Sequence, residues 1–291
     1  MPELLNDILC RIGNLLRDSG IRNYFLEARV LVATILNRPV NQIHPAMSVE
    51  MTDEQSDKLD SLVARRCLGE PLQLITGLVG FYNCVLKCEK GVLIPRIETE
   101  ILVDRALEIL SDFPADISAR ILDLGTGTGA IPIAIATCES RHSYYGVDLS
   151  QQAVDLAHKN AELNMTTDRT WFYQGDYFEP VHNWKDIRFD LITSNPPYIK
   201  TDDLKNLDRE VVDWDPKSAL DGGPDGLDHY RIILKDLPNY LAIDGKALFE
   251  IDPSYVESLE KIVSDRGLAV SGIFKDYDGN DRVIEISIYN R

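Results

Sequence analysis

Cysteine and histidine are both scarce in this chain, and neither forms a pattern that would bind a metal. The five cysteines are scattered, and only Cys84 and Cys88 lie close together in the sequence. A zinc site needs about four ligands at suitable spacing, and no histidine lies near this pair. The five histidines are dispersed and no Ser/His/Asp set is recognisable, so we expect surface or packing roles for them. We therefore expect no metal and, by default, the reduced thiols of a cytoplasmic protein.

A long apolar run is also missing. No stretch of about 18 apolar residues is present, so we expect nothing that spans a membrane. The first residues lack the basic start, apolar core and small-residue cleavage site of a secretory signal. We expect a cytoplasmic monomer without a membrane partner, and its 291 residues suffice for one or two domains.

The chain has few basic residues: it contains 30 basic and 47 acidic side chains, which gives a net charge of −17. The imbalance lies beyond residue 90, since the first 90 residues hold 10 bases and 11 acids. Non-specific binding to nucleic acid needs clustered positive charge, so we expect no direct nucleic-acid binding. The segment Lys200–Asp228, with nine acids and four bases, is a candidate for steering a cationic protein loop. The other reading is that these acids only keep the surface soluble.

Apolar spacing divides the chain into three regions. Residues 1–70 predict three helices that end near residues 19, 37 and 68, the third opened by a capping box of Thr52 and Gln55. Residues 71–95 predict a linker with short strands near 81–82, 85–87 and 92–94. Over residues 96–291 helix and strand patterns alternate, which indicates a parallel, doubly wound α/β sheet. Its seven predicted strands lie near residues 120–124, 143–148, 170–174, 189–194, 246–251, 268–275 and 282–289.

The most informative segment is Asn195-Pro196-Pro197-Tyr198, directly after the apolar run 189–194. That run predicts a buried strand, and two prolines end its ladder because neither has an N–H to donate. Open α/β sheets bind ligands at the carboxyl ends of their strands. The Asn195 side-chain oxygen and the Pro196 carbonyl can each accept one N–H of a planar nitrogen, and Tyr198 offers a flat face. This favours methyl transfer to an amide or amine nitrogen, although a Pro-Pro turn capped by Asn195 is the simpler alternative.

A glycine-rich turn precedes that segment. The strand pattern 120–124 leads into Gly125-Thr126-Gly127-Thr128-Gly129 and an apolar helical run in which Pro132 fits only the first turn. Glycines let backbone approach a ligand at a helix N-terminus. Asp148, which ends the next strand, can accept both ribose hydroxyls of a nucleoside. The spacing also fits a dinucleotide fingerprint, so NAD, S-adenosylmethionine and a turn without any nucleotide all stay open from this half alone.

Together the two motifs resemble class I S-adenosylmethionine-dependent methyltransferases, which have a Rossmann-like fold. From about residue 50 to the end, the chain resembles the HemK-type peptide chain release factor glutamine methyltransferases. Leu93-Ile94-Pro95-Arg96-Ile97-Glu98-Thr99-Glu100 is similar to their L-I-P-R-P-D-T-E segment. Shorter matches are Gly69-Glu70-Pro71-Leu72 with Thr76-Gly77, the loop Trp214–Leu220, and the segment Asp276–Val283.

The resemblance implies roles for the matching residues. Tyr177 stands where relatives often have Trp, and either ring can stack on adenine, while Asp176 would bind the adenine amino group. The segment Glu250-Ile251-Asp252-Pro253 departs from the usual E-I-G, so the role of that loop stays open. The implied cofactor-binding residues are Gly125, Thr126, Gly127, Thr128, Gly129, Asp148, Asp176, Tyr177 and Asn195. The implied substrate-binding residues are Arg96, Glu100, Asn195, Pro196, Pro197 and Tyr198, with Asn195, Pro196 and Tyr198 also catalytic.

The resemblance further implies an enzyme that methylates the glutamine side-chain amide in the Gly-Gly-Gln loop of peptide chain release factors. S-adenosylmethionine would be the donor and S-adenosylhomocysteine the product, and the reaction would support translation termination. The release factor would be the protein partner, recognised in part by the N-terminal helical domain. Three alternatives stay open: a glutamine methyltransferase acting on a ribosomal protein, an adenine amino-methyltransferase acting on nucleic acid, and a binding module without turnover.

Overall fold

The computed structural model describes residues 3–44, 48–184 and 187–288. The chain forms two compact units, one of Met1–Gly77 with Arg209–Trp214 and one of Leu78–Asp208 with Asp215–Arg291. The sequence placed the first boundary near residue 70 and did not anticipate that residues 209–214 belong with the N-terminal part. Within the described ranges, no helix is long and apolar enough to cross a membrane.

The first unit is helical, as the sequence predicted. The three predicted helices are present, and the Thr52 capping box closes through reciprocal bonds of 3.2 and 3.0 Å with Gln55. A short antiparallel pair of strands, β1 and β2, joins the residues just before the first of these helices to those just before the third. The elements are α1 Leu5–Asp18, α2 Tyr24–Leu36, α3 Asp53–Cys67, α4 Leu72–Thr76, α8 Arg209–Trp214, β1 Glu3–Leu4 and β2 Ser48–Val49.

A buried arginine ties α8 to the other helices of this unit. The Arg66 side chain on α3 is only 7% exposed and donates to Glu27 on α2 at 2.6 Å. It also donates to Glu210 on α8 and to the Glu70 carbonyl, both at 2.9 Å. A buried guanidinium is costly unless its donors are satisfied, so these partners fix where α8 packs.

The second unit contains the seven-stranded sheet that the sequence predicted. Its order is β10-β11-β9-β8-β5-β6-β7, and β11 runs antiparallel to both of its neighbours, β10 and β9, whereas the other neighbouring pairs are parallel. A separate hairpin pairs β3 Leu78–Phe81 with β4 Cys84–Lys87. The sheet strands are β5 Arg120–Leu124, β6 Ser143–Asp148, β7 Thr170–Gln174, β8 Phe189–Ser194, β9 Leu241–Glu250, β10 Leu268–Lys275 and β11 Asp281–Ile288. Residue 289, predicted at the end of the last strand, lies outside the described residues.

The predicted strand at 92–94 is wrong. These residues have no regular structure, and Val92 packs against Ala153 and Leu156 of the helix α7 (Gln151–Leu163) instead. Three apolar residues before a proline satisfy a strand pattern, but here Val92 is buried against a helix and no described strand pairs with these residues.

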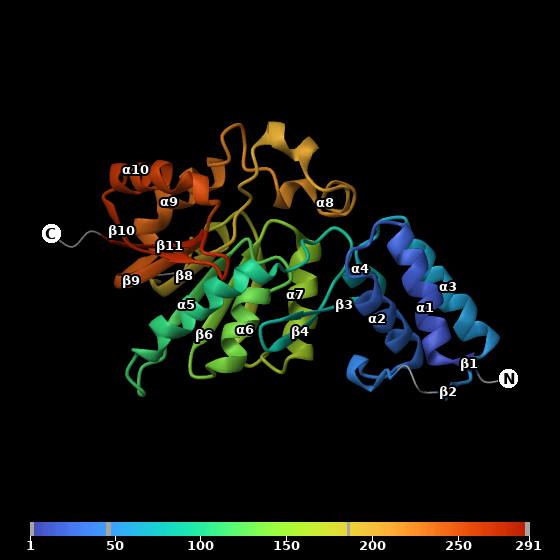
Figure 1. The fold of residues 1–291 in the computed structure, drawn as a ribbon. Coiled ribbons are helices and arrows are strands. Elements are labelled where there is room, and N and C mark those ends of the chain that lie inside the picture. Colours follow the sequence, from blue (N-terminus) through green and yellow to red (C-terminus); the bar gives the residue numbers. More distant parts are fainter. Residues whose placement is uncertain (1–2, 45–47, 185–186, 289–291) are drawn as a thin grey trace. The chain divides into compact units, whose positions relative to one another are not determined.

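Helices cover both faces of the sheet, as doubly wound folds require. Alternating side chains of β5 divide between two cores: Ile121 packs with α5, α6 and α7, and Leu122 with α9 and α10. Figure 1 shows the same division, with α5–α7 on one side and α9 and α10 on the other. These helices are α5 Glu100–Ser111, α6 Ala130–Cys138, α7 Gln151–Leu163, α9 Asp228–Tyr240 and α10 Val256–Asp265.

The strand order reverses at β5. From β5 the chain moves outward through β6 and β7, then returns to the other side of β5 with β8 and β9. The loops after β5 and β8 therefore diverge at the carboxyl edge, which creates a crevice at such a switch point. The glycine-rich turn follows β5 and Asn195 follows β8, so both motifs meet there.

Candidate active site

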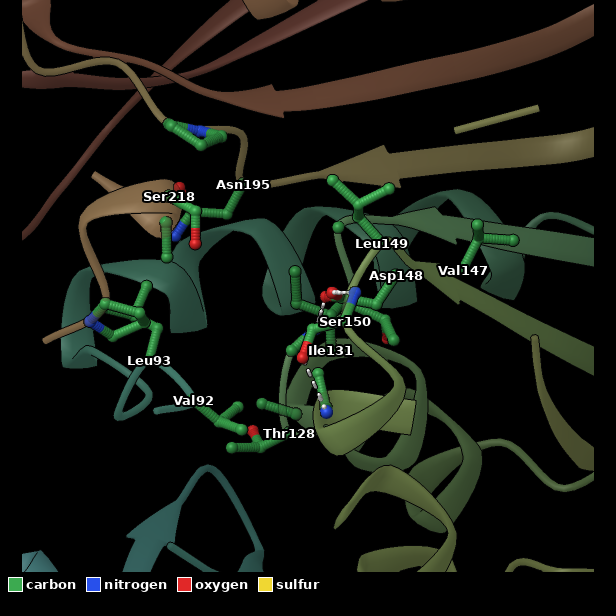
Figure 2. Close-up of a pocket in the computed structure, with 18 of the residues that line it drawn as sticks. Val92, Leu93, Thr128, Ile131, Val147, Asp148, Leu149, Ser150, Asn195 and Ser218 are labelled. Atoms are coloured by element: carbon green, nitrogen blue, oxygen red, sulfur yellow. Dashed lines mark hydrogen bonds between the residues drawn. The ribbon is translucent and has the colours of Figure 1, made fainter. Parts of the chain in front are cut away.

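A cavity of about 520 Å³ lies at this edge of the sheet. Its size is in the range typical of small-molecule sites. The wall combines the glycine-rich turn, the end of β6, the segment before α5 and residues after β7 and β8. Figure 2 shows Asp148 and Ser150 on one side of this space and Asn195 with Ser218 on another.

The glycine-rich turn presents bare backbone to the cavity. Gly125 and Gly127 have φ values of 71° and 55°, a left-handed region that favours glycine. A Cβ built on either one would meet no atom within 4 Å. Gly129 differs, because its Cβ would approach Ile133 Cδ1 to 2.9 Å, so this glycine serves helix packing. Pro132 lies in the first turn of α6, as predicted.

Asp148 is fixed at the end of β6 by two backbone donors. Its Oδ2 accepts from the Gly127 N–H at 2.8 Å and its Oδ1 from the Ser150 N–H at 2.9 Å. A carboxylate oxygen can accept two hydrogen bonds, so each oxygen keeps one site for a ligand. Burial raises the pKa of Asp148, while the two N–H groups oppose this rise. The carboxylate is therefore held in one orientation at the cavity wall.

Asn195 is oriented by residues from distant parts of the sequence. Its Nδ2 donates to Thr99 Oγ1 at 3.1 Å, and Thr99 Oγ1 donates to Glu250 Oε2 at 2.6 Å. Because the single hydroxyl proton of Thr99 is used by Glu250, Thr99 can only accept from Asn195. No hydrogen bond among the described residues uses Asn195 Oδ1. Asn195 lines the cavity, so this oxygen is an acceptor available to a ligand.

The rest of the Asn-Pro-Pro-Tyr segment divides between the cavity and the protein interior. Pro197 lines the cavity, whereas Pro196 and Tyr198 are outside its lining. Within the described parts of the chain, no hydrogen bond uses the Pro196 carbonyl. The Tyr198 hydroxyl donates to Glu250 Oε1 at 3.3 Å, and the Tyr198 carbonyl accepts from Tyr255. The structure therefore anchors Tyr198 on Glu250 and does not place its ring at the cavity surface, where the sequence had predicted it.

Arg96 and Glu100 were both predicted to bind the substrate, but only Arg96 lines the cavity. Arg96 lines the cavity and pairs with Asp215, which anchors the loop whose Ser218 and Ala219 also line it. Glu100 is outside the lining, and its Oε1 accepts from the Tyr82 N–H at 2.6 Å. Glu100 opens α5, where a carboxylate is favourable near the helix N-terminus. The structure thus assigns Glu100 to the β3–β4 hairpin and does not bring it to the predicted substrate site.

Tyr177 is held by a histidine that the sequence did not single out. Both line the cavity, and the Tyr177 hydroxyl is hydrogen-bonded to His229 Nδ1. His229 Nε2 lies 3.1 Å from the Asp221 carbonyl, which can only accept. The tautomer with its proton on Nε2 satisfies both contacts, with Nδ1 accepting from the Tyr177 hydroxyl. The sequence predicted a surface or packing role for the histidines and did not place His229 in a cavity wall, to which the packing of α9 brings it. Asp176 also lines the cavity.

The cavity fits a nucleoside-bearing cofactor. Open glycine backbone, a fixed carboxylate with two free acceptor sites and an immobilised phenol are present around one space. These groups match an amino-acid moiety, a ribose and an aromatic base. Among the described residues, no group of three or more His, Cys, Asp or Glu side chains is placed to hold a metal ion.

Comparisons with known proteins agree with this geometry. The Methyltransferase small domain matches residues 100–214 and the PrmC N-terminal domain matches residues 7–77. The release factor glutamine methyltransferase of Thermodesulfovibrio yellowstonii is 38% identical over 89% of this chain and 90% of its own length. That of Fusobacterium nucleatum is 36% identical over 96% of this chain and 77% of its own.

A solved structure supports the fold alone. The N-terminal domain of human METTL16 has a TM-score of 0.51 and 14% identity, covering 84% of this chain and 86% of that one. At such identity a shared fold says nothing of the substrate. The relatives at 36–38% identity carry the assignment, and the chain belongs to the release factor glutamine methyltransferase family.

Proposed function

We propose that this enzyme transfers a methyl group from S-adenosylmethionine to the glutamine side-chain amide in the Gly-Gly-Gln loop of peptide chain release factors. The observation that carries the proposal is the orientation of Asn195, whose Nδ2 is committed to Thr99. Its Oδ1 can then accept an N–H from a planar amide at the cavity. Family membership names the substrate class, because the relatives are called release factor glutamine methyltransferases. The methyl donor supplies an electrophilic methyl group bound to a sulfonium.

The cofactor would be held by the groups already described. The backbone at Gly125 and Gly127 would lie against its amino-acid part, and Asp148 would accept the two ribose hydroxyls. Tyr177 and Asp176 would meet the adenine. In this arrangement the ribose replaces water at the two free acceptor sites of Asp148, so the carboxylate stays fully hydrogen-bonded when the cofactor binds.

The remaining residues would position the nucleophile. Asn195 Oδ1 and the Pro196 carbonyl would accept the two N–H groups of the glutamine amide, which orients its nitrogen and stabilises the positive charge that develops there. The nitrogen lone pair forms the new N–C bond while the S–C electron pair returns to sulfur. The surplus proton leaves the nitrogen for water after transfer, so no general base is required beforehand.

Two observations favour this substrate over the alternatives. The net charge of −17 is unfavourable for a nucleic-acid substrate, which argues against an adenine amino-methyltransferase. The Leu93–Glu100 segment resembles the release-factor branch more than the ribosomal-protein branch. We also propose a cytoplasmic monomer without direct nucleic-acid binding, in which the helical first unit helps to recognise the release factor.

Methyl transfer with a labelled donor tests this function. The purified chain would be incubated with methyl-labelled S-adenosylmethionine and an unmodified bacterial-type release factor. A parallel reaction would use the same factor with the glutamine of its Gly-Gly-Gln loop changed to alanine. We expect label only in the first reaction. Equal label in both would reject the target residue, and no label in either would reject the release factor as substrate.

A further inference from the structure

Glu250 is a buried carboxylate that the mechanism above does not use. It is the last residue of β9 and is only 2% exposed. Burying a carboxylate is costly unless it is fully hydrogen-bonded. Glu250 satisfies this need with both of its oxygens, because Oε2 accepts from Thr99 at 2.6 Å and Oε1 accepts from Tyr198 at 3.3 Å. Both donors hold parts of the Asn195–Tyr198 segment.

The direction of each proton in this network depends on Glu250. An ionised carboxylate is only an acceptor, so it draws the Thr99 hydroxyl proton toward itself. Thr99 Oγ1 is then an acceptor toward Asn195, and the Asn195 amide must turn its NH₂ inward. If Glu250 were replaced by an amide, its NH₂ could donate to Thr99 and release the hydroxyl proton. Thr99 could then donate to Asn195, whose amide would rotate and present NH₂ to the substrate.

Glu250 is placed as an acceptor, because both of its side-chain contacts are with hydroxyl donors. Burial raises the pKa of Glu250 and the Glu98 charge adds to this rise, while the Thr99 hydroxyl, the Arg282 charge and the Tyr198 hydroxyl oppose it. Arg282 is anchored by Asp276, to which it donates at 3.1 Å. The Tyr230 hydroxyl donates to the Glu250 carbonyl at 2.6 Å and fixes the backbone at this point. The carboxylate therefore has little freedom to turn away from Thr99.

We propose that Glu250 is a positioning residue. It acts through Thr99 to fix which group of the Asn195 side-chain amide, the oxygen or the NH₂, points to the substrate. It acts through Tyr198 to hold the other end of the same segment. The proposal rests on the proposed function, because the orientation of Asn195 matters only if its Oδ1 accepts from a substrate N–H. It also gives a role to Glu250, the first residue of the segment Glu250-Ile251-Asp252-Pro253. The departure at Asp252-Pro253 leaves this role intact, since the Asp252 side chain caps the following turn.

Glu250→Gln is the central test, because it keeps the shape of the side chain and removes its charge. We expect kcat on the release factor to fall about 100-fold, the cost typical of a misplaced catalytic group. The Kd for S-adenosylhomocysteine should stay within about threefold, because Glu250 is outside the cavity lining that contains Asp148. Thr99→Val should reproduce the loss of kcat, and Thr99→Ser, which restores the hydroxyl, should recover most of it.

Glu285→Gln is the matched control. Glu285 is also a buried carboxylate on a sheet strand, 3% exposed, and it accepts from Arg105 and Ser271 at 2.8 and 2.7 Å. Its substitution should lower the unfolding temperature without lowering kcat. If Glu285→Gln and Glu250→Gln lower kcat equally, Glu250 has only a structural role. The double variant Glu250→Gln/Thr99→Val should be no slower than either single variant, because both break one chain of hydrogen bonds.

A readout without turnover separates this proposal from the function that it serves. The side-chain amide of Asn195 gives a ¹⁵N NMR signal that can be assigned by its loss in Asn195→Ala. In ligand-free protein this signal should shift in Glu250→Gln and Thr99→Val and stay in place in Glu285→Gln. An unchanged signal in Glu250→Gln would overturn the positioning role, whatever the activity. A shifted signal in a protein whose wild type never methylates release factors would keep the positioning role and reject the proposed substrate.

Discussion

Asp148→Asn gives a quantitative test of the proposed cofactor site. In the wild-type chain both carboxylate oxygens accept a backbone N–H, from Gly127 at 2.8 Å and from Ser150 at 2.9 Å. An asparagine has only one oxygen, so its NH₂ must face one of these two donors. The change therefore removes one backbone bond and one of the two acceptors proposed for the ribose.

The expected loss of affinity follows from these bonds. A hydrogen bond to a charged acceptor contributes about 1.5–3 kcal/mol, and at least one such bond to the ribose is lost. Each 1.4 kcal/mol is tenfold in affinity, so the Kd for S-adenosylhomocysteine should rise about 10- to 150-fold. Disturbance of the Gly127 backbone adds to this loss and makes the lower figure a conservative bound.

Isothermal titration of S-adenosylhomocysteine into both proteins measures this effect. Asp155→Asn is the control, because Asp155 lies on α7, is exposed, and accepts only from Gln151 among the hydrogen bonds described. Burial raises the pKa of Asp148, so wild-type affinity should weaken as the pH falls toward that pKa, while Asp148→Asn should respond less. A change in Kd below about threefold, with an unchanged unfolding temperature, would refute the ribose assignment.

Four further predictions use other parts of the structure. Asn195→Ala should keep the Kd for S-adenosylhomocysteine and lower kcat by about 100- to 1,000-fold; normal turnover would reject its role as an acceptor. Arg66→Met should lower the free energy of unfolding in urea by about 3 kcal/mol, because it leaves the Glu27 carboxylate, 13% exposed, without its partner. As a control, Arg11→Met removes the exposed ion pair with Asp60 and should lower the free energy of unfolding by less than about 1 kcal/mol. Equal losses in Arg66→Met and Arg11→Met would contradict the argument. Burial raises the pKa of Asp123 to about 7, so the folded state keeps a proton that the unfolded state releases near pH 4. The unfolding temperature of the wild type should therefore fall as the pH rises from 5 to 8, and that of Asp123→Asn should fall less. A difference between the two unfolding temperatures that stays constant over this range would exclude this titration. Charge reversal at three exposed acids should raise the KM for the release factor at unchanged kcat, and an unchanged KM would reject steering by Asp202, Asp203 and Asp208.

The sequence was sufficient for features that depend on neighbouring residues. Apolar spacing located the seven sheet strands and the N-terminal helices, because burial on one face imposes a period on the chain. The glycine-rich turn and Asp148 were recognisable because each lies at the end of a single predicted strand, so the local sequence suffices to find it. The strand predicted at 92–94 failed because three apolar residues are too few to show a period that separates a strand from a loop packed on a helix.

Only the tertiary structure decided how the site is oriented. Thr99 precedes Asn195 by 96 positions and Glu250 follows Thr99 by 151, yet their side chains form one chain of hydrogen bonds. The position of His229 against Tyr177 and the return of α8 to the helical unit depend equally on long-range packing. The order of strands in the sheet determines which loops meet, and no local pattern encodes that order. The sequence by itself thus indicated candidate groups near single strands, whereas the fold decided which of them line the cavity and which hydrogen bonds orient them.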